Sequence, residues 1–238
     1  MLWYKAWLET RARFLIALLG ILCLCSYSVL HGERQAAPWV GRSYYNYVLS
    51  EGHGLLAVMW VLAVMLLMMG GLLREQSLGS ATFTLGLPVS RRQLMAARIG
   101  MGVLQASTIA LIPSGTMYLI ARASGKAFSL SQTWFHLVIL LTGGAVFFAI
   151  ALLASSIVEG EYTAPVVAFG ILLVISATLG DKRTRPFSPL AFTIGTEYFD
   201  PHSNLLVGPT PWLEAAVWLC LAALLTWIAV RVIERRDF

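Results

Sequence analysis

Long uncharged apolar runs alternate with short polar stretches along the whole chain. Six of these runs approach the roughly 20 residues that a helix needs to cross a bilayer, and they lie at residues 14–30, 55–73, 99–121, 134–158, 162–179 and 213–230. Five contain no Asp, Glu, Lys or Arg, and the sixth contains only Glu214, close to its start. The pattern predicts an all-α polytopic membrane domain that comprises residues 1–238 and has six transmembrane helices.

Composition supports a membrane protein and excludes several other classes. Hydrophobic residues make up 58% of the chain and charged residues only 12%, whereas about 25% of the residues of soluble proteins are charged. This composition excludes disordered, collagen-like and disulfide-stapled secreted chains. The net charge of +5 comes from scattered basic residues rather than from one basic face. Nucleic acid is therefore not an expected partner, whereas membrane lipid is an expected one.

The positions of Lys and Arg predict the orientation in the membrane, because cytoplasmic ends of helices carry more of them. With a cytoplasmic N-terminus, ten basic residues fall on the cytoplasmic side and seven on the outer side. Both termini are therefore predicted to be cytoplasmic. The first apolar run has about 17 residues, which is longer than the core of a cleaved signal peptide, so we expect a retained signal-anchor helix.

This topology creates three loops of interest. A long cytoplasmic loop spans residues 74–98, and a short cytoplasmic turn consists of Glu159, Gly160 and Glu161. A long outer loop, residues 180–212, is rich in Pro and Gly, and its apolar patch Pro189–Ile194 is too short to span the bilayer. The outer loop is either a plain folded loop or a shallow re-entrant hairpin.

The apolar runs lack the ionisable side chains that usually mark ion pathways in membranes. Apart from Glu214 at one rim, the only acidic or basic side chain is His136, near the start of the fourth run. A serine–histidine dyad of Ser114 and His136 would need hydrogen-bonding contact, but Ser114 is expected deep in its helix and His136 near the outer end of the next. The dyad is therefore not predicted, and we expect no catalytic residue.

No metal site or phosphate-binding loop is expected. Three further histidines are predicted to be isolated in outer loops: His31, His53 and His202. The three cysteines, Cys23, Cys25 and Cys220, all lie in apolar runs without metal-ligand spacing, so they are predicted to be buried inert thiols. The chain also lacks the glycine-rich Lys-Ser/Thr motif that holds ATP phosphates.

The long cytoplasmic loop carries the most informative pattern. Leu78, Ala81 and Leu85 fall at helical spacing, so a short helix here would have one apolar face. Pro88 must end that helix, and Ser90 suits the N-cap of the third transmembrane helix. The prediction is an amphipathic helix along the cytoplasmic membrane surface, and a passive linker is its alternative.

The same loop resembles that of the type 2 ATP-binding-cassette (ABC) exporter permeases. In that family a Glu after the second helix is followed by Gly-Thr, and the loop ends in Leu-x-Leu-Pro-Val-Ser-Arg. Here Glu75 stands at the first position, Gly79-Ser80 replaces Gly-Thr, and residues 85–91 match the ending in full. The C-terminal Arg235-Arg236-Asp237 also resembles an ending common in the family.

The resemblance implies a function divided between subunits. The chain would be the membrane subunit of an exporter in a bacterial inner membrane, paired with an identical or different second permease. A separate cytoplasmic ABC ATPase dimer would bind and hydrolyse ATP, so this chain would be neither an enzyme nor a cofactor protein. The apolar helices suit an amphipathic or lipid-like cargo. The residues that the resemblance assigns to ATPase coupling are Glu75, Leu78, Gly79, Leu85, Leu87, Pro88, Ser90, Arg91, Glu159 and Glu161.

Two other functions stay open. A secondary transporter of a neutral solute would need polar sites at broken helices, for which the candidates are Pro113, where we expect a kink, and Gly143-Gly144. A non-transport membrane subunit would use the cytoplasmic loop to recruit a soluble partner without moving cargo.

Overall fold

Each of the six predicted apolar runs forms a helix. The computed structural model describes residues 2–35, 52–68, 90–125, 130–158, 163–179, 183–195, 198 and 211–235, and none of these residues lies in a strand. The predicted all-α class is confirmed for them. The six helices are α1 (Leu2–Gln35), α3 (His53–Met68), α6 (Arg91–Ala123), α7 (Leu130–Ile157), α8 (Thr163–Thr178) and α10 (Trp212–Arg235).

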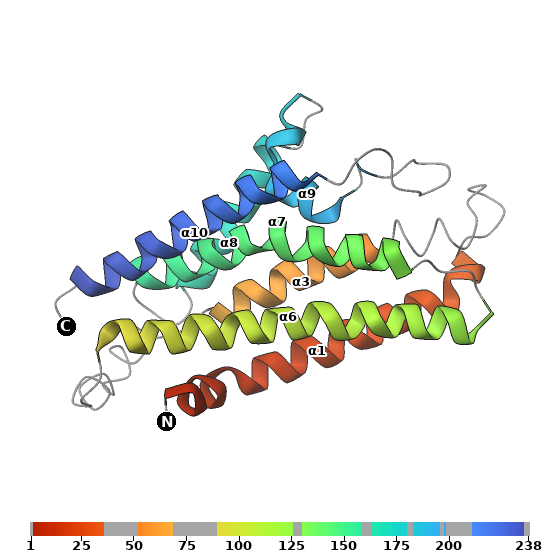
Figure 1. Ribbon diagram of the computed structural model, residues 1–238, viewed down its shortest axis with the longest axis horizontal. Helices are drawn as coiled ribbons and strands as arrows, with labels where there is room; N and C mark the ends of the chain where they lie inside the picture. Colours follow the sequence, from red (N-terminus) through yellow and green to blue (C-terminus); the bar gives the residue numbers. More distant parts are fainter. Residues whose placement is uncertain are drawn as a thin grey trace.

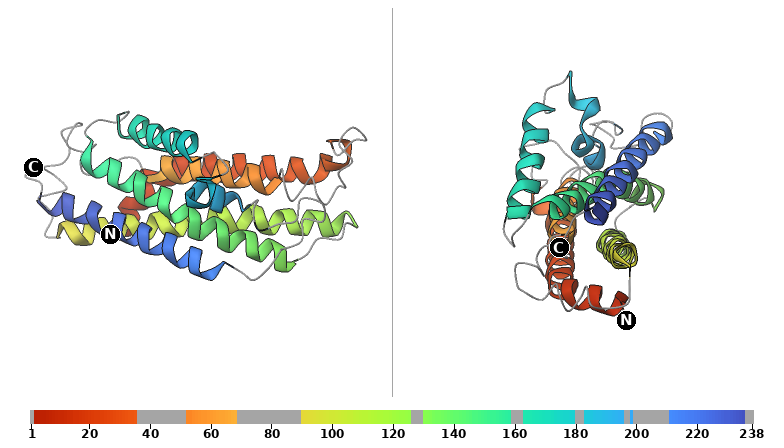
Figure 2. Two further views of the ribbon diagram at one scale, coloured as in Figure 1. Left: turned by 90° about the horizontal axis from the view of Figure 1, so that it is seen from above. Right: turned by 90° about the vertical axis from the view of Figure 1, so that its left-hand side faces the viewer.

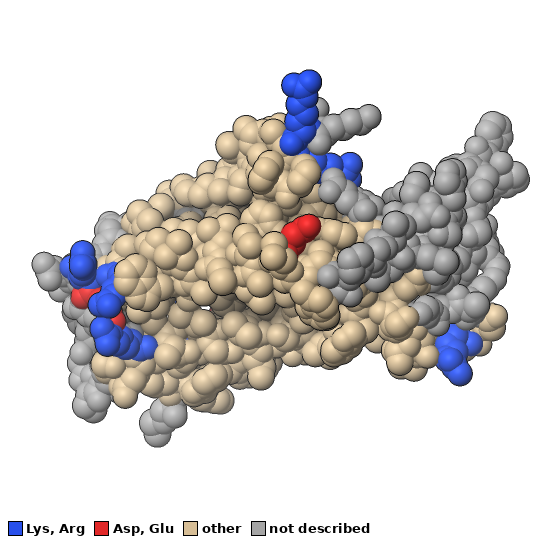
Figure 3. Space-filling view, turned by 45° about the horizontal axis from the view of Figure 1, so that its top comes forward, with Lys and Arg blue, Asp and Glu red and all other residues tan. Residues whose placement is uncertain are grey.

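Four of these helices are long and apolar enough to cross a membrane: α1, α6, α7 and α10. The described parts of α3 and α8 have 16 residues each, which corresponds to about 24 Å at 1.5 Å per residue, and they are apolar but shorter. On the face in Figure 3, charged side chains lie at the two ends of the bundle and in one further basic group between them, and the rest of the described surface is uncharged apart from a single acidic spot. The structure is thus all-helical and compatible with a membrane protein, and six spans stay a prediction.

The long helices lie side by side along one axis, and helices that follow each other in the chain run in opposite directions (Figure 1). The ends of the described chain, Leu2 and Arg235, lie at the same end of the bundle. Figure 2 shows α7 near the middle when the bundle is viewed along its axis, and α7 contacts α3, α6, α8 and α10. In its most apolar window 67% of the residues are buried, against 17% in α10, so α10 turns most of its apolar side chains outwards, towards the bilayer.

Helix α1 extends well beyond the predicted residues 14–30 at its start. Its first turns run across the axis of the bundle (Figure 2). Lys5 and Glu9, one helical turn apart, form an ion pair of 3.8 Å. Thr10 accepts a hydrogen bond of 2.8 Å from Gln105 of α6. The Trp3 indole also lies against Gly100 of α6, and Ala6 is buried, so polar and apolar contacts both hold the turns that precede the predicted run.

Helix α6 begins at the predicted N-cap. The backbone N–H of Gln93 donates to the Ser90 hydroxyl oxygen at 3.2 Å, and the N–H of Ser90 donates to the Gln93 side-chain oxygen at 3.0 Å. This reciprocal capping box satisfies donors that the first turn of a helix leaves without partners. The helix continues without interruption through Pro113, and the kink expected there stays a prediction.

The core is closely packed where α3, α6 and α7 meet. Trp60 of α3 is 1% exposed, and its indole N–H donates to the carbonyl of Ala106 in α6 at 2.8 Å. The indole ring lies directly against Gly144 of α7, where a side chain would overlap it. One tryptophan therefore fixes the spacing of three helices, and the glycine allows the close approach.

The outer loop contains two short helices, η2 (Arg185–Phe187) and α9 (Pro189–Ile194). Ser188 caps α9 by accepting a bond of 3.3 Å from the Ala191 N–H, and Gly195 ends it with a positive φ of 75°. Phe192 and Thr193 are buried and lie against Gly143 of α7. The apolar patch of the outer loop is thus a helix that packs on the bundle.

Candidate functional site

The predicted ATPase-coupling surface falls mostly outside the described residues. Ser90 and Arg91 are described, as the N-cap and the first residue of α6. The coupling residues outside the described ranges are Glu75, Leu78, Gly79, Leu85, Leu87, Pro88, Glu159 and Glu161. The assignment of these residues stays a prediction, and the structure locates only the point at which the cytoplasmic loop enters α6.

An ion-pair cluster ties that entry point to the end of α10. The guanidinium of Arg92 donates to both carboxylate oxygens of Glu234, through Nε and, at 3.2 Å, through Nη2. Arg231 donates to the same carboxylate at 3.4 Å. The Arg92–Glu234 bond joins residues 142 positions apart and so links the start of α6 to the end of α10. Exposed ion pairs add little stability, so this link is expected to contribute little to the free energy of unfolding.

Two more arginines at this end donate to backbone carbonyls of α3. Arg13 of α1 reaches the carbonyl of Leu66 at 3.3 Å, and Arg98 of α6 reaches that of Met68 at 2.7 Å. Cations are favourable near the C-terminal end of a helix, where the carbonyl dipoles point outwards. Basic residues of α1, α6 and α10 thus gather at one end of the bundle, the end that the sequence predicts to be cytoplasmic.

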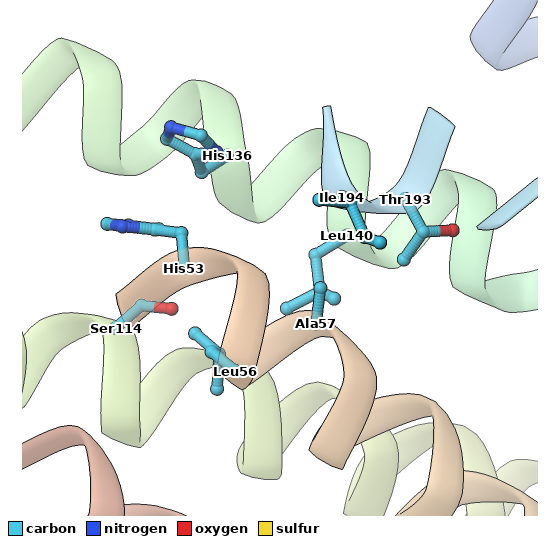
Figure 4. Close-up of a pocket in the computed structure, with 8 residues that line it drawn as sticks. All are labelled: His53, Leu56, Ala57, Ser114, His136, Leu140, Thr193 and Ile194. Atoms are coloured by element: carbon cyan, nitrogen blue, oxygen red, sulfur yellow. The ribbon is translucent and has the colours of Figure 1, made fainter. Parts of the chain in front are cut away.

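A buried histidine pair lies towards the opposite end. His53, the first residue of α3, and His136 of α7 are 4% and 9% exposed, and their rings stack with centroids 4.2 Å apart and an interplanar angle of 28°. In Figure 4 the two rings lie one over the other beside a small cavity. The prediction that His53 is isolated in an outer loop is wrong, because His53 already belongs to α3 and packs against α7.

The same cavity brings Ser114 close to both histidines. Ser114 of α6 and Thr193 of α9 line it together with Leu56, Ala57, Leu140 and Ile194 (Figure 4). The prediction that Ser114 and His136 lie at different depths is therefore also wrong. The cavity has a volume of about 10 Å³, which is the space of about one water molecule. It has no room for a peptide or lipid substrate, so the arrangement does not support hydrolysis.

A metal centre is not supported within the described ranges, which contain no group of three or more His, Cys, Asp or Glu side chains that could hold an ion. The site that the structure reveals is thus a pair of imidazoles with two hydroxyl groups and apolar walls. Imidazole is the side chain whose ordinary pKa lies closest to neutrality, so the chemistry available here is the uptake and release of a proton.

Comparison with known proteins adds no family assignment. No protein-family model matches the chain, and a search of curated proteins finds no match.

Sequence reasoning missed the histidine pair for a specific reason. Gly52-His53-Gly54 directly precedes an apolar run, which places His53 in the first turn of a helix if the helix begins slightly before the run. That signal indicates burial of His53, but contact with His136 depends on how α3 and α7 are rotated against each other.

Proposed function

We propose that the chain is the membrane-spanning permease subunit of an ABC exporter that moves an amphipathic or lipid-like cargo across a bacterial inner membrane. The observation that carries the proposal is the segment Leu85-Gly86-Leu87-Pro88-Val89-Ser90-Arg91, which resembles the end of the cytoplasmic loop in type 2 exporter permeases. A partner ATPase dimer supplies the energy, and a second permease of the same or another kind completes the transporter.

The bundle agrees with this division of labour in two respects. The described chain starts and ends at one end of the bundle, and the loop before Ser90 enters α6 at that same end, beside the cluster of Arg92 and Glu234. A partner that contacted the start of α6 would therefore also lie beside both ends of the described chain. Six spans, with α3 and α8 as the two shorter ones, belong to this proposal.

The second line of support for an ABC exporter is that its helices offer few groups for coupling to an ion gradient. Between Ile99 and Ala121 of α6, and in all of α7 and α8, no Asp, Glu, Lys or Arg occurs. A transporter driven by ion gradients usually carries such groups within its helices. The chain also lacks a phosphate-binding loop of its own, so ATP must be hydrolysed by another subunit.

The buried histidine pair favours a second candidate, a secondary transporter driven by protons. His53 and His136 can hold a proton, and they lie at an interface of helices next to α9. The two candidates differ in their energy source, which makes them separable by experiment.

Transport is expected to follow ATP and to survive loss of the proton gradient. Inverted membrane vesicles from cells that overproduce the chain and its partner ATPase should accumulate a fluorescent amphipathic dye when ATP is added. An uncoupler should leave this uptake largely unchanged, whereas vanadate, which traps ABC ATPases, should abolish it. Vesicles with the Leu85→Ala chain serve as the matched control. Uptake that stops with the uncoupler while ATP remains would instead support the secondary transporter.

A further inference from the structure

We infer that His53 and His136 form a proton-binding site near the outer end of the bundle, and that binding of a proton there releases α9 from its seat on α7. The inference goes beyond export and holds for either energy source, because it concerns only the described helices. Its ligand is a proton from the outer medium, and its effect is to open the small cavity to water.

The first step is the surroundings of the pair. The remaining residues that line the cavity are uncharged: Leu56, Ala57, Ser114, Leu140, Thr193 and Ile194. Both imidazoles are more than nine-tenths buried, and the cavity holds about one water molecule. A proton on either ring would place a charge where water cannot surround it, and the protein disfavours this. A second proton would set two like charges 4.2 Å apart.

The second step concerns α9, whose displacement can expose a charged imidazole to water. Helix α9 has six residues and contributes Thr193 and Ile194 to the cavity wall. It is seated by close contact, since a side chain at Gly143 would meet Phe192 Cδ1 at 2.7 Å and Thr193 Cα at 3.2 Å. Figure 4 shows α9 across the cavity from the histidine rings. Displacement of this short helix admits water and leaves the transmembrane helices in place.

The third step is the sign of the pH effect. The pKa of imidazole in water is about 6.5, so the water-exposed form of the site binds protons as the pH falls through this value. The closed form disfavours the charged ring. Protons therefore bind preferentially to the open form, and acidification below about pH 6.5 shifts the equilibrium towards it, by at most about tenfold per pH unit for one proton. At neutral pH the closed form is favoured.

Other titratable groups have to be distinguished from the pair. The described parts of α3, α7, α8 and α9 carry no further titratable side chain. On the neighbouring elements, the described groups towards the outer end are Tyr27, His31, Tyr118, Arg122, Arg183, Arg185, Tyr198 and Glu214. Control variants are needed for the histidine and the carboxylate among them, His31 and Glu214. His31 stacks on Tyr27, and Glu214 accepts a hydrogen bond from Tyr198, whose ring contacts Phe135 and Phe192.

The test is hydrogen exchange of α9 in the full chain in lipid nanodiscs, from pH 7.5 to 5.5. The reporters are the N–H groups of Phe192 and Gly195, which donate to the carbonyls of Ser188 and Ala191 at 3.1 and 2.9 Å. Wild type is compared at each pH with a His53→Asn/His136→Gln variant, so that the intrinsic pH dependence of exchange cancels. The wild type is expected to exchange about tenfold faster than the variant at pH 5.5, relative to their ratio at pH 7.5. His31→Asn and Glu214→Gln should behave as wild type.

A second measurement guards against a variant that fails to fold. The chain has four histidines, so carbon-13 labelling of their rings gives an NMR spectrum in which single replacements identify each signal. Two signals are expected to titrate together with the exchange of α9. The proposal is overturned if α9 exchange in wild type does not respond to pH, if the double variant responds equally, or if Glu214→Gln removes the response. Because no ATPase or cargo is present, none of these results depends on the proposed transport function.

Discussion

Replacing Gly144 with alanine is expected to lower the free energy of unfolding of the bundle by roughly 1–3 kcal/mol, the usual cost of overpacking a filled core. An added methyl group would lie 2.6 Å from Cη2 of Trp60, inside van der Waals contact. The indole cannot turn aside cheaply, since it is 1% exposed and its N–H is bonded to Ala106. The measurement is thermal or denaturant unfolding of the purified chain in detergent.

Gly115→Ala is the matched control for this prediction. Gly115 also lies in a helix of the bundle, but a methyl group there would meet nothing within 4 Å. The free energy of unfolding of the Gly115→Ala variant should be unchanged or slightly higher, because alanine restricts the unfolded chain more than glycine does. Equal loss of stability in both variants would show that Trp60 is not seated against Gly144 as described.

Leu85→Ala is expected to weaken binding of the partner ATPase by about tenfold to a hundredfold. The proposed coupling helix would bury Leu85 against the ATPase, and burial of a leucine side chain contributes about 1.5–3 kcal/mol. The stability of the purified chain alone should barely change if, as proposed, Leu85 packs on the ATPase and not on the bundle. The measurement is co-purification of the ATPase with the variant, alongside an unfolding assay of the variant by itself.

Glu75→Ala extends the coupling test to the polar side of the proposed helix. It should also reduce ATPase recovery, since Glu75 occupies the position that a Glu holds in the exporter permeases. The matched control is Ser77→Ala, a change in the same loop at a residue outside the proposed contact. Normal ATPase recovery and normal ATP-driven uptake in both Leu85→Ala and Glu75→Ala would leave the loop as a passive membrane-surface linker.

The sequence predicted the helices well because their signal is local. An apolar run of about 20 residues must satisfy its backbone hydrogen bonds internally when it lies in lipid, and all six runs are helical. The N-cap at Ser90 was equally predictable, since a serine followed three residues later by glutamine is a local capping pattern. The early start of α1 was missed because its first turns are held by contacts with α6 such as that of Thr10 with Gln105.

Contacts between helices could not be predicted in the same way. Whether His53 meets His136, or Trp60 meets Gly144, depends on the rotation and offset of α3 against α7. In a soluble helix, polar residues mark the exposed face and thereby define the buried one. Apolar membrane helices have too few polar residues for this, so the sequence holds little information about how each helix is rotated about its axis. Ser114 and His136 were therefore placed apart on depth alone, whereas the packing brings both to one cavity.

The side of the membrane on which the loop before α6 lies tests the central claim most directly. In a six-span permease, α3 crosses the bilayer and the loop is cytoplasmic, where an ATPase can bind it. A four-span arrangement in which α3 does not cross would bring the chain to Ser90 on the outer side, and it would require a packing other than the one described, in which α6 starts at the same end of the bundle as α1. A single cysteine at Ser77, in a chain whose Cys23, Cys25 and Cys220 are replaced by serine, can be probed with a membrane-impermeant maleimide. The account predicts labelling in inverted vesicles and none in intact spheroplasts, and labelling in intact spheroplasts would contradict it.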